Sequence, residues 1–518
     1  MEKRLAQLQG VVILTMSEFK LRPYQADAVE RILSALERGS VAFQSPTGSG
    51  KTLVALEVMR RLGPSSAFTR TLSQYEPWER EVRRLGLMLG GLAGKDRFCL
   101  RPMTKRDGES VRITRCFSCP FAFNSYDRSR LQELGVVGFL SWLRGKDECG
   151  YGWLRFLDAN VYLYTYPYFF FYRKMVRGNA LLVFDEAHNL VSVGDMVGVE
   201  ITADRLRAIR RDYEGTDVQE IVSTALDAVE SWALHGAASG SRPPDADEFE
   251  LEAVEDHRIS SVFHALSKVG HPAYKVYARP DGVSIRLMDP AEELSKLNEE
   301  KWLMMSGTLP SEGYMRRVWG LQDFQVVEVR PYRMKFSYFW DRDHSTRLTE
   351  RKSARSGYVR AVSKLKGKGL TLVLTPSYEV ASWFKGIADY VESRESAPSD
   401  VPREGLVVAV ARGKLSEGVE FVEDGRSLIK RVVIVGIPYP NVGDPYVRDE
   451  VEFLSKKLGS RSRWFLLRED ALLIIRQAMG RAIRNQEDSA EVYFLDRRAG
   501  PFLRRLGLNP KRVRLVDL

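Results

Sequence analysis

The chain has 518 residues, with 44% hydrophobic and 28% charged side chains, and its 78 Lys and Arg outnumber its 68 Asp and Glu, for a net charge of +10. This is the composition of a folded protein of two to four domains, and it excludes a largely disordered chain. The longest apolar stretch, 161–172, is about half as long as a bilayer span, which excludes a membrane-spanning helix, and the mild positive charge permits a nucleic-acid partner without requiring one.

The first site pattern in the chain is the segment SPTGSGKT, which follows an expected strand at 41–43 and precedes an expected helix at 53–62. A strand, a glycine-rich turn and a helix form the setting of a phosphate-binding loop, because the turn and the helix N-terminus present backbone N–H groups to phosphate oxygens. Lys51 would reach the β and γ phosphates, and Thr52 would offer a hydroxyl to Mg²⁺. We therefore expect ATP or GTP to be bound by Ser45, Pro46, Thr47, Gly48, Ser49, Gly50, Lys51 and Thr52.

The cysteines, Cys99, Cys116, Cys119 and Cys149, all fall in one window with the spacing C-x16-C-x2-C-x29-C. Four thiolates can hold a zinc ion or an iron–sulfur cluster. Zinc ribbons usually have two close pairs, whereas this window has one close pair and two distant cysteines. The spacing is thus not that of a usual zinc ribbon, and both zinc and an iron–sulfur cluster stay open at this point, ahead of buried small side chains. The long last gap leaves room for an inserted helix or loop at 127–142.

Eight Tyr and Phe residues lie between 162 and 172, just before the next motif. Single-stranded bases stack on exposed aromatic faces, but the alternation of Tyr from 162 to 168 also fits one face of a buried strand. Most of these rings are expected in the core of the protein. Only Tyr166 and Phe169 are predicted to lie near a bound single strand of nucleic acid.

The segment Asp185–His188 reads DEAH and follows an apolar strand that ends at Phe184. An acidic residue at the end of a buried strand beside a phosphate loop can hold the shell of Mg²⁺, which is the role expected of Asp185. Glu186 can then orient or activate the attacking water. An acidic pair that only caps a helix is the alternative, and the occurrence of both motifs in this order argues against it.

Two regions interrupt the alternation of short apolar strands and amphipathic helices. Residues 90–155 are basic and aromatic and contain every cysteine. Residues 195–290 are polar, with helical patterns at 203–213 and 218–234 and an acidic run at 245–256 that we expect to be solvated. The alternation resumes beyond 320 and predicts a second α/β domain.

The segment Gln477–Arg484 reads QAMGRAIR and ends a strongly apolar helical stretch. Arg481 and Arg484, three residues apart, are expected on one helical face, where two guanidinium groups can stabilise charge on a transferring phosphoryl group. Taken alone, a solvated basic end of a helix is the more ordinary interpretation.

Together, these segments resemble the motifs of superfamily 2 helicases, and more closely those of the XPD family of iron–sulfur helicases. The motifs follow the family's order along nearly the whole chain. They read RPYQ (22–25), SPTGSGKT, TRTLSQ (69–74), DEAH, SGTLP (306–310), TPSYEV (375–380), RGKLSEGVEF (412–421) and QAMGRAIR.

The resemblance implies a role for each matching residue. Besides the phosphate loop, it implies ATP binding by Arg22, Gln25 and Glu420, the last standing where relatives usually have Asp. It implies catalysis by Lys51, Asp185, Glu186, Gln477, Arg481 and Arg484, with Mg²⁺ held by Thr52 and Asp185. It also implies a [4Fe–4S] cluster on Cys99, Cys116, Cys119 and Cys149, coupling through His188, Ser306 and Thr308, and DNA contact by Arg70 and Thr71.

The resemblance further implies an α/β fold of two RecA-like P-loop motor domains, with an iron–sulfur insertion and a mainly helical arch insertion in the first. The expected limits are 1–90, 155–195 and 291–318 for motor domain 1, 91–154 for the iron–sulfur domain, 196–290 for the arch and 319–518 for motor domain 2.

By resemblance we expect an ATP-dependent DNA helicase that moves 5′ to 3′ on single-stranded DNA, unwinds forked duplex DNA and acts in repair with partners the sequence does not identify. Because the N-terminus has no signal-peptide pattern, we expect a cytoplasmic protein, nucleoid-associated if prokaryotic, with no membrane partner. One rival is a translocase or damage-verification module with little strand separation. Another is a nucleotide-binding scaffold, against which intact Lys51, Glu186, Arg481 and Arg484 argue.

Overall fold

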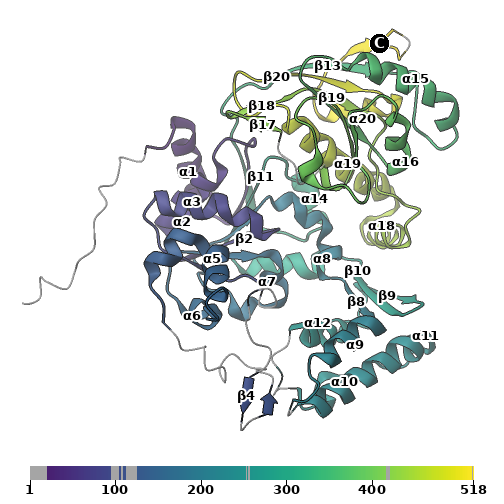
Figure 1. Cartoon of the computed structure of the whole chain (residues 1–518). Helices are drawn as coiled ribbons and strands as arrows, with labels where there is room; N and C mark the ends of the chain where they lie inside the picture. The colour runs from purple at the N-terminus through teal and green to yellow at the C-terminus, as the bar shows by residue number, and fades with distance from the viewer. Residues whose placement is uncertain are drawn as a thin grey trace, which may run out of the picture.

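The computed structural model describes residues 20–94, 98, 104–106, 109–111, 125–216, 218–251, 254, 257–415, 421–515 and 517–518. Cys99, Cys116, Cys119 and Glu420 lie outside these residues. In Figure 1 most of the second half of the chain, in green and yellow, forms the upper lobe, and the first half forms the lower one. Each lobe is built around a seven-stranded sheet of parallel strands. The prediction of an α/β protein with two such domains is confirmed.

The first sheet has the order β12-β1-β11-β7-β2-β6-β3, and every neighbouring pair is parallel. Successive residues of β2 and β11 are buried without alternation, so both faces of the sheet are covered, as is usual for parallel strands. The strands are β1 (Ser40–Gln44), β2 (Ser65–Thr69), β3 (Leu89–Gly91), β6 (Val161–Thr165), β7 (Leu182–Asp185), β11 (Trp302–Ser306) and β12 (Phe324–Glu328).

The limit expected between the motor domains, 318/319, is wrong. β12 lies beyond that limit but pairs with β1, with Ala42 beside Val326, so it belongs to the first sheet. Its backbone hydrogen-bonding groups are satisfied there, and the chain enters the second sheet only at Lys335. Motor domain 1 therefore extends to Glu328.

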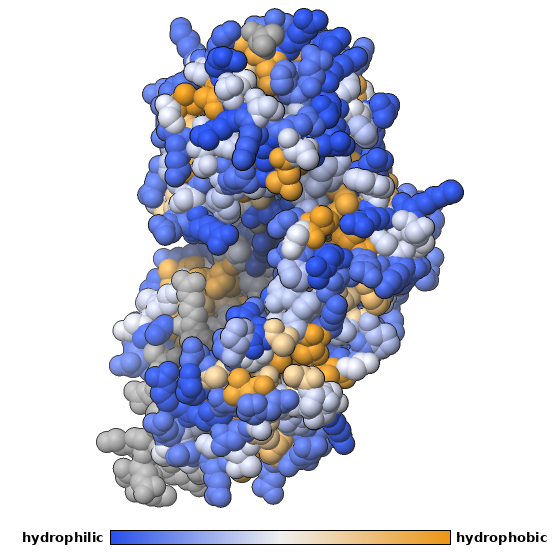
Figure 2. Space-filling view, turned by 90° about the vertical axis from the view of Figure 1, so that its right-hand side faces the viewer, coloured by the Kyte–Doolittle hydropathy of each residue, from blue (hydrophilic) through white to orange (hydrophobic). Residues whose placement is uncertain are grey.

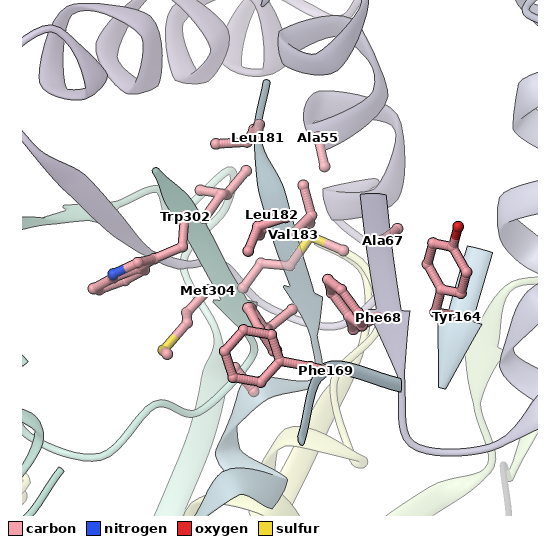
Figure 3. Close-up of a cluster of buried hydrophobic side chains, with 14 of the residues drawn as sticks. Ala55, Ala67, Phe68, Tyr164, Phe169, Leu181, Leu182, Val183, Trp302 and Met304 are labelled. Atoms are coloured by element: carbon pink, nitrogen blue, oxygen red, sulfur yellow. The ribbon is translucent and has the colours of Figure 1, made fainter. Parts of the chain in front are cut away.

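The core of motor domain 1 surrounds β7, as Figure 3 shows. Phe68 stacks on Phe184 with ring centroids 4.9 Å apart, and Phe169 meets Phe184 edge-on at 5.3 Å. Phe169 is 6% exposed and Tyr166 is 1% exposed. Neither ring offers a face on which a base could stack, so the prediction that these two residues lie near DNA is corrected in favour of the core interpretation.

The helices of this lobe include the inserted element expected at 127–142. It is the helix α5 (Arg128–Arg144), which begins at Asp127, whose carboxylate accepts from the Ser129 N–H, and which packs on the same core. The other helices are α1 (Pro23–Leu36), α2 (Lys51–Leu62), α3 (Tyr75–Arg84), α6 (Tyr151–Phe156), α7 (Tyr166–Phe171), α8 (Val193–Val197), α13 (Ala291–Leu294) and α14 (Glu312–Arg317), and a hairpin of β4 (Thr104–Arg106) and β5 (Glu109–Val111) lies in the cysteine window.

The arch is more than a helical insertion. A three-stranded antiparallel sheet of order β8-β10-β9 supports its helices, and the two layers enclose a separate apolar core. Helices still make up most of its regular structure, as expected, and the sheet is the part that the sequence patterns did not predict. The elements are β8 (Val199–Thr202), α9 (Ala203–Arg211), α10 (Gln219–Ser231), α11 (Ala237–Ser239), α12 (His257–Leu266), β9 (Tyr274–Arg279) and β10 (Gly282–Leu287).

The second sheet has the order β15-β16-β14-β19-β20-β13-β21, again with all pairs parallel. Its strands are β13 (Lys335–Asp341), β14 (Leu370–Thr375), β15 (Tyr390–Val391), β16 (Gly405–Val410), β19 (Ile429–Ile434), β20 (Ser489–Phe494) and β21 (Lys511–Val513), and β17 (Val422–Glu423) and β18 (Arg426–Ser427) form a hairpin. Its helices are α15 (Arg351–Lys364), α16 (Tyr378–Ala381), α18 (Pro445–Leu458), α19 (Arg463–Gly480) and α20 (Gly500–Arg505).

The face of the molecule seen in Figure 2 is mostly hydrophilic and is hollowed between the upper and lower lobes. Within the described ranges, no helix is both long and apolar enough to span a bilayer.

Candidate nucleotide site between the motor domains

Three neighbouring strands of the first sheet end at the candidate site. β1 leads into the phosphate loop, β11 ends at Ser306 and β7 ends at Asp185. Gln44 of β1 lies beside Ser306, and Met305 of β11 lies beside Asp185. Ligands of parallel α/β sheets bind at the carboxyl ends of the strands, and segments that are far apart in sequence meet here for that reason.

The backbone of the phosphate loop takes positive φ angles at its two glycines, a conformation that glycine readily adopts. Gly48 and Gly50 both have φ of +81°, and α2 begins directly after Gly50. A side chain at Gly48 would come within 2.9 Å of the Arg484 carbonyl, and one at Gly50 within 2.3 Å of Gln25 Nε2. Glycine is therefore required at both positions by conformation, and at Gly48 by the nearby backbone as well.

Lys51 and Glu186 face each other at the centre of the site. Lys51 is 7% exposed, and its Nζ lies 3.7 Å from Glu186 Oε1. Glu186 has φ of +49°, an unusual backbone conformation for a residue with a side chain. Ser306 Oγ donates to Glu186 Oε2 at 3.1 Å, and His188 Nδ1 lies 2.8 Å from the same Ser306 Oγ. The predicted catalytic carboxylate and two predicted coupling residues thus share one hydrogen-bonded cluster.

The two acidic residues of this segment have opposite pKa shifts. Burial, with the charge of Glu186 beside it, raises the pKa of Asp185 to about 6. Burial would also raise the pKa of Glu186, but Lys51, His188 and Ser306 outweigh it and hold that pKa below its usual range. A cation bound at Asp185 would favour its ionised form. Asp185 is held by Trp78, whose Nε1 donates to Oδ2 at 2.9 Å, and Thr52 lies half-buried in the first turn of α2.

The segment RPYQ lies against the phosphate loop. Gln25 accepts from the Arg22 backbone N–H at 3.0 Å and donates through Nε2 to the Ser49 carbonyl at 3.0 Å. The hydroxyl of Tyr24 donates to the same carbonyl at 3.1 Å. Of the two residues of this segment that were predicted to bind ATP, Gln25 thus contacts the loop directly and Arg22 contacts Gln25.

A cleft of about 1070 Å³ separates the two lobes at this point. Gln477, Arg481 and Arg484 of motor domain 2 line one wall, and Thr47, Glu186, His188 and Thr308 of motor domain 1 line the other.

The expectation that Arg481 and Arg484 share one helical face is wrong. α19 ends at Gly480, so Arg481 caps the helix and Arg484 lies in the turn that follows. Both nevertheless line the cleft. The hydroxyl of Tyr332, in the chain segment between β12 and β13, donates to the Arg484 carbonyl at 2.8 Å and so holds this turn.

Arg70 and Thr71, the predicted DNA contacts, lie on the floor of the same cleft. Arg70 Nη1 donates to Asn189 Oδ1 at 2.8 Å, and Thr71 caps the short helical turn that leads into α3. Their role toward DNA stays a prediction.

Of the four cysteines, Cys149 alone falls in the described part of the chain. It is half-buried beside the core, and its carbonyl accepts from the Tyr126 hydroxyl at 3.2 Å. Tyr126, whose hydroxyl makes this bond, follows the stretch of chain that carries the other three cysteines. The backbone of Cys149 is therefore held close to one end of that stretch, which fits the expected cysteine donor set, although the described residues contain no cluster of potential metal ligands.

Several residues of the site were not predicted from the sequence. Trp78 and Tyr332, outside the matched motifs, and Tyr24, inside RPYQ, form hydrogen bonds to Asp185, Arg484 and Ser49 respectively. Their partners are 25 to 152 residues away, so only the fold brings them together.

Comparisons with known proteins agree with this geometry. Residues 385–502 match the family model described as "Helicase C-terminal domain", and 18–73 match "Type III restriction enzyme, res subunit". The chain is 28% identical to the ATP-dependent DNA helicase XPD of Sulfolobus acidocaldarius over 92% of this chain and 96% of that protein. Over 18% of this chain and 10% of the other, it is 38% identical to the ATP-dependent DNA helicase DDX11 of Mus musculus.

The fold is also similar to solved structures. A structure described as an XPD helicase superimposes with a TM-score of 0.69 at 25% identity, over 95% of this chain and all of that one. A second, described as apo XPD, gives 0.64 at 24% identity, over 94% of this chain and all of that one. The two parallel-sheet domains are therefore RecA-like motor domains, as predicted.

Proposed function

We propose that this chain, an XPD-like helicase of superfamily 2, is an ATP-dependent DNA helicase that translocates on single-stranded DNA and unwinds forked duplex. The observation that carries the proposal is the cleft in which Glu186, paired with Lys51 in one motor domain, faces Gln477, Arg481 and Arg484 of the other. A site divided between two lobes links hydrolysis to their relative movement.

The residues of the cleft divide the work of phosphoryl transfer. Lys51 and the backbone of the phosphate loop would bind the β and γ phosphates, and Thr52 and Asp185 would hold Mg²⁺. Glu186, kept ionised by Lys51, would orient and deprotonate the attacking water. Arg481 and Arg484 would stabilise charge on the transferring group when the lobes close.

We further propose that Cys99, Cys116, Cys119 and Cys149 hold a [4Fe–4S] cluster. The one-pair spacing supports this assignment over zinc, and the position of Cys149 beside Tyr126 is compatible with it. The cluster would cross-link residues 99–149, which would stiffen this part of the chain as a wedge for strand separation. Iron and sulfide analysis with a visible absorption spectrum tests this assignment, and stoichiometric zinc without sulfide would contradict it.

Movement from 5′ to 3′ and a role in DNA repair are part of the proposal and rest on the family resemblance. ATP, single-stranded DNA and forked duplex are the proposed ligands.

The decisive experiment compares ATP hydrolysis with and without single-stranded DNA, and unwinding of forks with a 5′ or a 3′ tail. We expect ATPase activity that rises with DNA, and unwinding of the 5′-tailed fork. Translocation without strand separation would favour the translocase alternative. An ATPase indifferent to DNA would contradict the proposal altogether.

A further inference from the structure

The first half of α19 lies against motor domain 1, although the helix belongs to motor domain 2. Leu466 of α19 and Leu454 of α18 are part of the apolar cluster of the first lobe. The rings of Phe465 and of Tyr314 in α14 are 6.1 Å apart. The second half of α19 carries Gln477 into the nucleotide cleft. One helix thus spans from an apolar contact between the lobes to the candidate ATP site.

Glu469 is a buried carboxylate within this contact, with 1% of its surface exposed. It accepts from the Ser311 hydroxyl at 2.8 Å and from the Ser311 backbone N–H at 3.4 Å, and it pairs with Arg505 of α20. Ser311 caps the N-terminus of α14 in motor domain 1, where a negative charge is favoured. A buried carboxylate is costly unless its oxygens are paired, so Ser311 and Arg505 together explain how this charge is accommodated between the lobes.

Ser311 also ends the segment that begins at the catalytic cluster. Five residues earlier, Ser306 Oγ donates to Glu186 and accepts from the Thr308 backbone N–H at 3.1 Å. The segment 306–311 therefore touches the catalytic carboxylate at one end and α19 of the other lobe at its other end.

We propose that Glu469 is a positioning residue of the ATPase cycle, which through Ser311 ties the helix that bears Gln477 and is capped by Arg481 to the segment that contacts Glu186. Glu469 precedes Gln477 by two helical turns, about 12 Å along the axis. A displacement at the Ser311–Glu469 contact is carried by this helix to the cleft. The inference rests on the proposed function, because it concerns ATP hydrolysis in the same cleft.

Ser311→Ala tests the contact from the side of motor domain 1, and it leaves the Glu469–Arg505 pair intact. We expect kcat for DNA-stimulated ATP hydrolysis to fall about tenfold, within the usual range for one coupling contact. KM for ATP should stay within about twofold, because the phosphate loop is untouched. Ser311→Thr keeps the hydroxyl and should restore kcat. Glu469→Gln should reproduce the loss from the other side.

Thr202→Ala is the matched control, since Thr202 caps α9 in the arch with the same 3.3 Å contact that Ser311 makes in α14. It should match Ser311→Ala in thermal stability but keep kcat. In the double variant Ser311→Ala, Glu469→Gln, kcat should fall no further than in either single variant.

The inference would be overturned if Glu469→Gln hydrolysed ATP at the wild-type rate, if KM rose while kcat held, or if the two losses simply multiplied. None of these outcomes would contradict the proposed function. If the wild-type protein showed no DNA-stimulated ATP hydrolysis, both the positioning role of Glu469 and the proposed function would be contradicted.

Discussion

Lys51 is the residue on which the proposed chemistry depends most directly. It is nearly buried, at the first position of α2, and its ammonium group faces Glu186. With Lys51 in place the pKa of Glu186 stays low, so a base is available at neutral pH. In the proposed mechanism Lys51 thus has two roles, since it would bind the nucleotide phosphates and it keeps Glu186 ionised.

Lys51→Ala should reduce ATP hydrolysis to background while single-stranded DNA binding persists, because Arg70 and Thr71 do not depend on this ammonium group. Phosphate release and fluorescence anisotropy of labelled DNA measure the two properties. Lys456→Ala, at a mostly exposed lysine paired with Glu452, is the control and should retain both. Normal hydrolysis by Lys51→Ala would mean that nucleotide is bound elsewhere.

At the scale of elements, α5 shows how a helix in the cysteine window is fixed to motor domain 1. The helix is interrupted at Gly135, which has φ of +73°. The buried carboxylate of Glu79 in α3 accepts from the Val136 N–H at 2.7 Å, so it caps the second half of the helix. A side chain at Gly135 would come within 2.1 Å of that carboxylate. The interruption at Gly135 therefore leaves space for the Glu79 carboxylate and lets it cap the second half of the helix.

Gly135→Ala should destabilise motor domain 1 by about 1–2 kcal/mol, because alanine is strained at positive φ and displaces Glu79. Thermal unfolding should show a midpoint lower by a few degrees. Gly138→Ala in the same helix is the matched control, since its added Cβ finds only Leu134 at 3.4 Å. That change should be neutral or slightly stabilising. Equal midpoints for the two variants would contradict this account of the interruption.

At the scale of the whole molecule, motor domain 2 contacts the arch as well as motor domain 1. Asp449 of α18 pairs with Lys275 at 2.6 Å and accepts from the Tyr277 hydroxyl at 2.9 Å. The rings of Tyr277 and Tyr446 are 4.5 Å apart, and Lys457 pairs with Asp289. Figure 1 shows α18 beside the hairpin of β9 and β10. The arch is thus connected to both motor domains.

Asp449→Lys should loosen this contact by placing two positive charges together. Energy transfer between dyes on the arch and on motor domain 2 should report a longer distance or a broader distribution. The exchange Asp449→Lys, Lys275→Asp should restore the contact in part, since it brings opposite charges together again but loses the hydrogen bond from Tyr277 to Asp449. Unchanged transfer in Asp449→Lys would show that the apolar ring contact alone holds the arch.

The sequence predicted what depends on short segments. Glycines next to Lys51 specify a phosphate loop because only they permit its backbone, and runs such as 302–305 and 370–374 specify buried strands. The sequence does not reveal pairings between distant segments. Nothing in residues 324–328 themselves shows that β12 pairs with β1, and nothing near Phe169 in the sequence distinguishes its buried ring from an exposed one.

The sequence by itself determined the motor class, the two α/β domains and the candidate residues for ATP, because each motif encodes its chemistry within about ten residues. Only the tertiary structure decided that Ser311 meets Glu469, that Trp78 holds Asp185 and that Asp449 meets the arch. The reason is physical. Backbone conformation and burial pattern are local properties of the chain, whereas a hydrogen bond between segments far apart exists only after the sheets have formed and the lobes have packed.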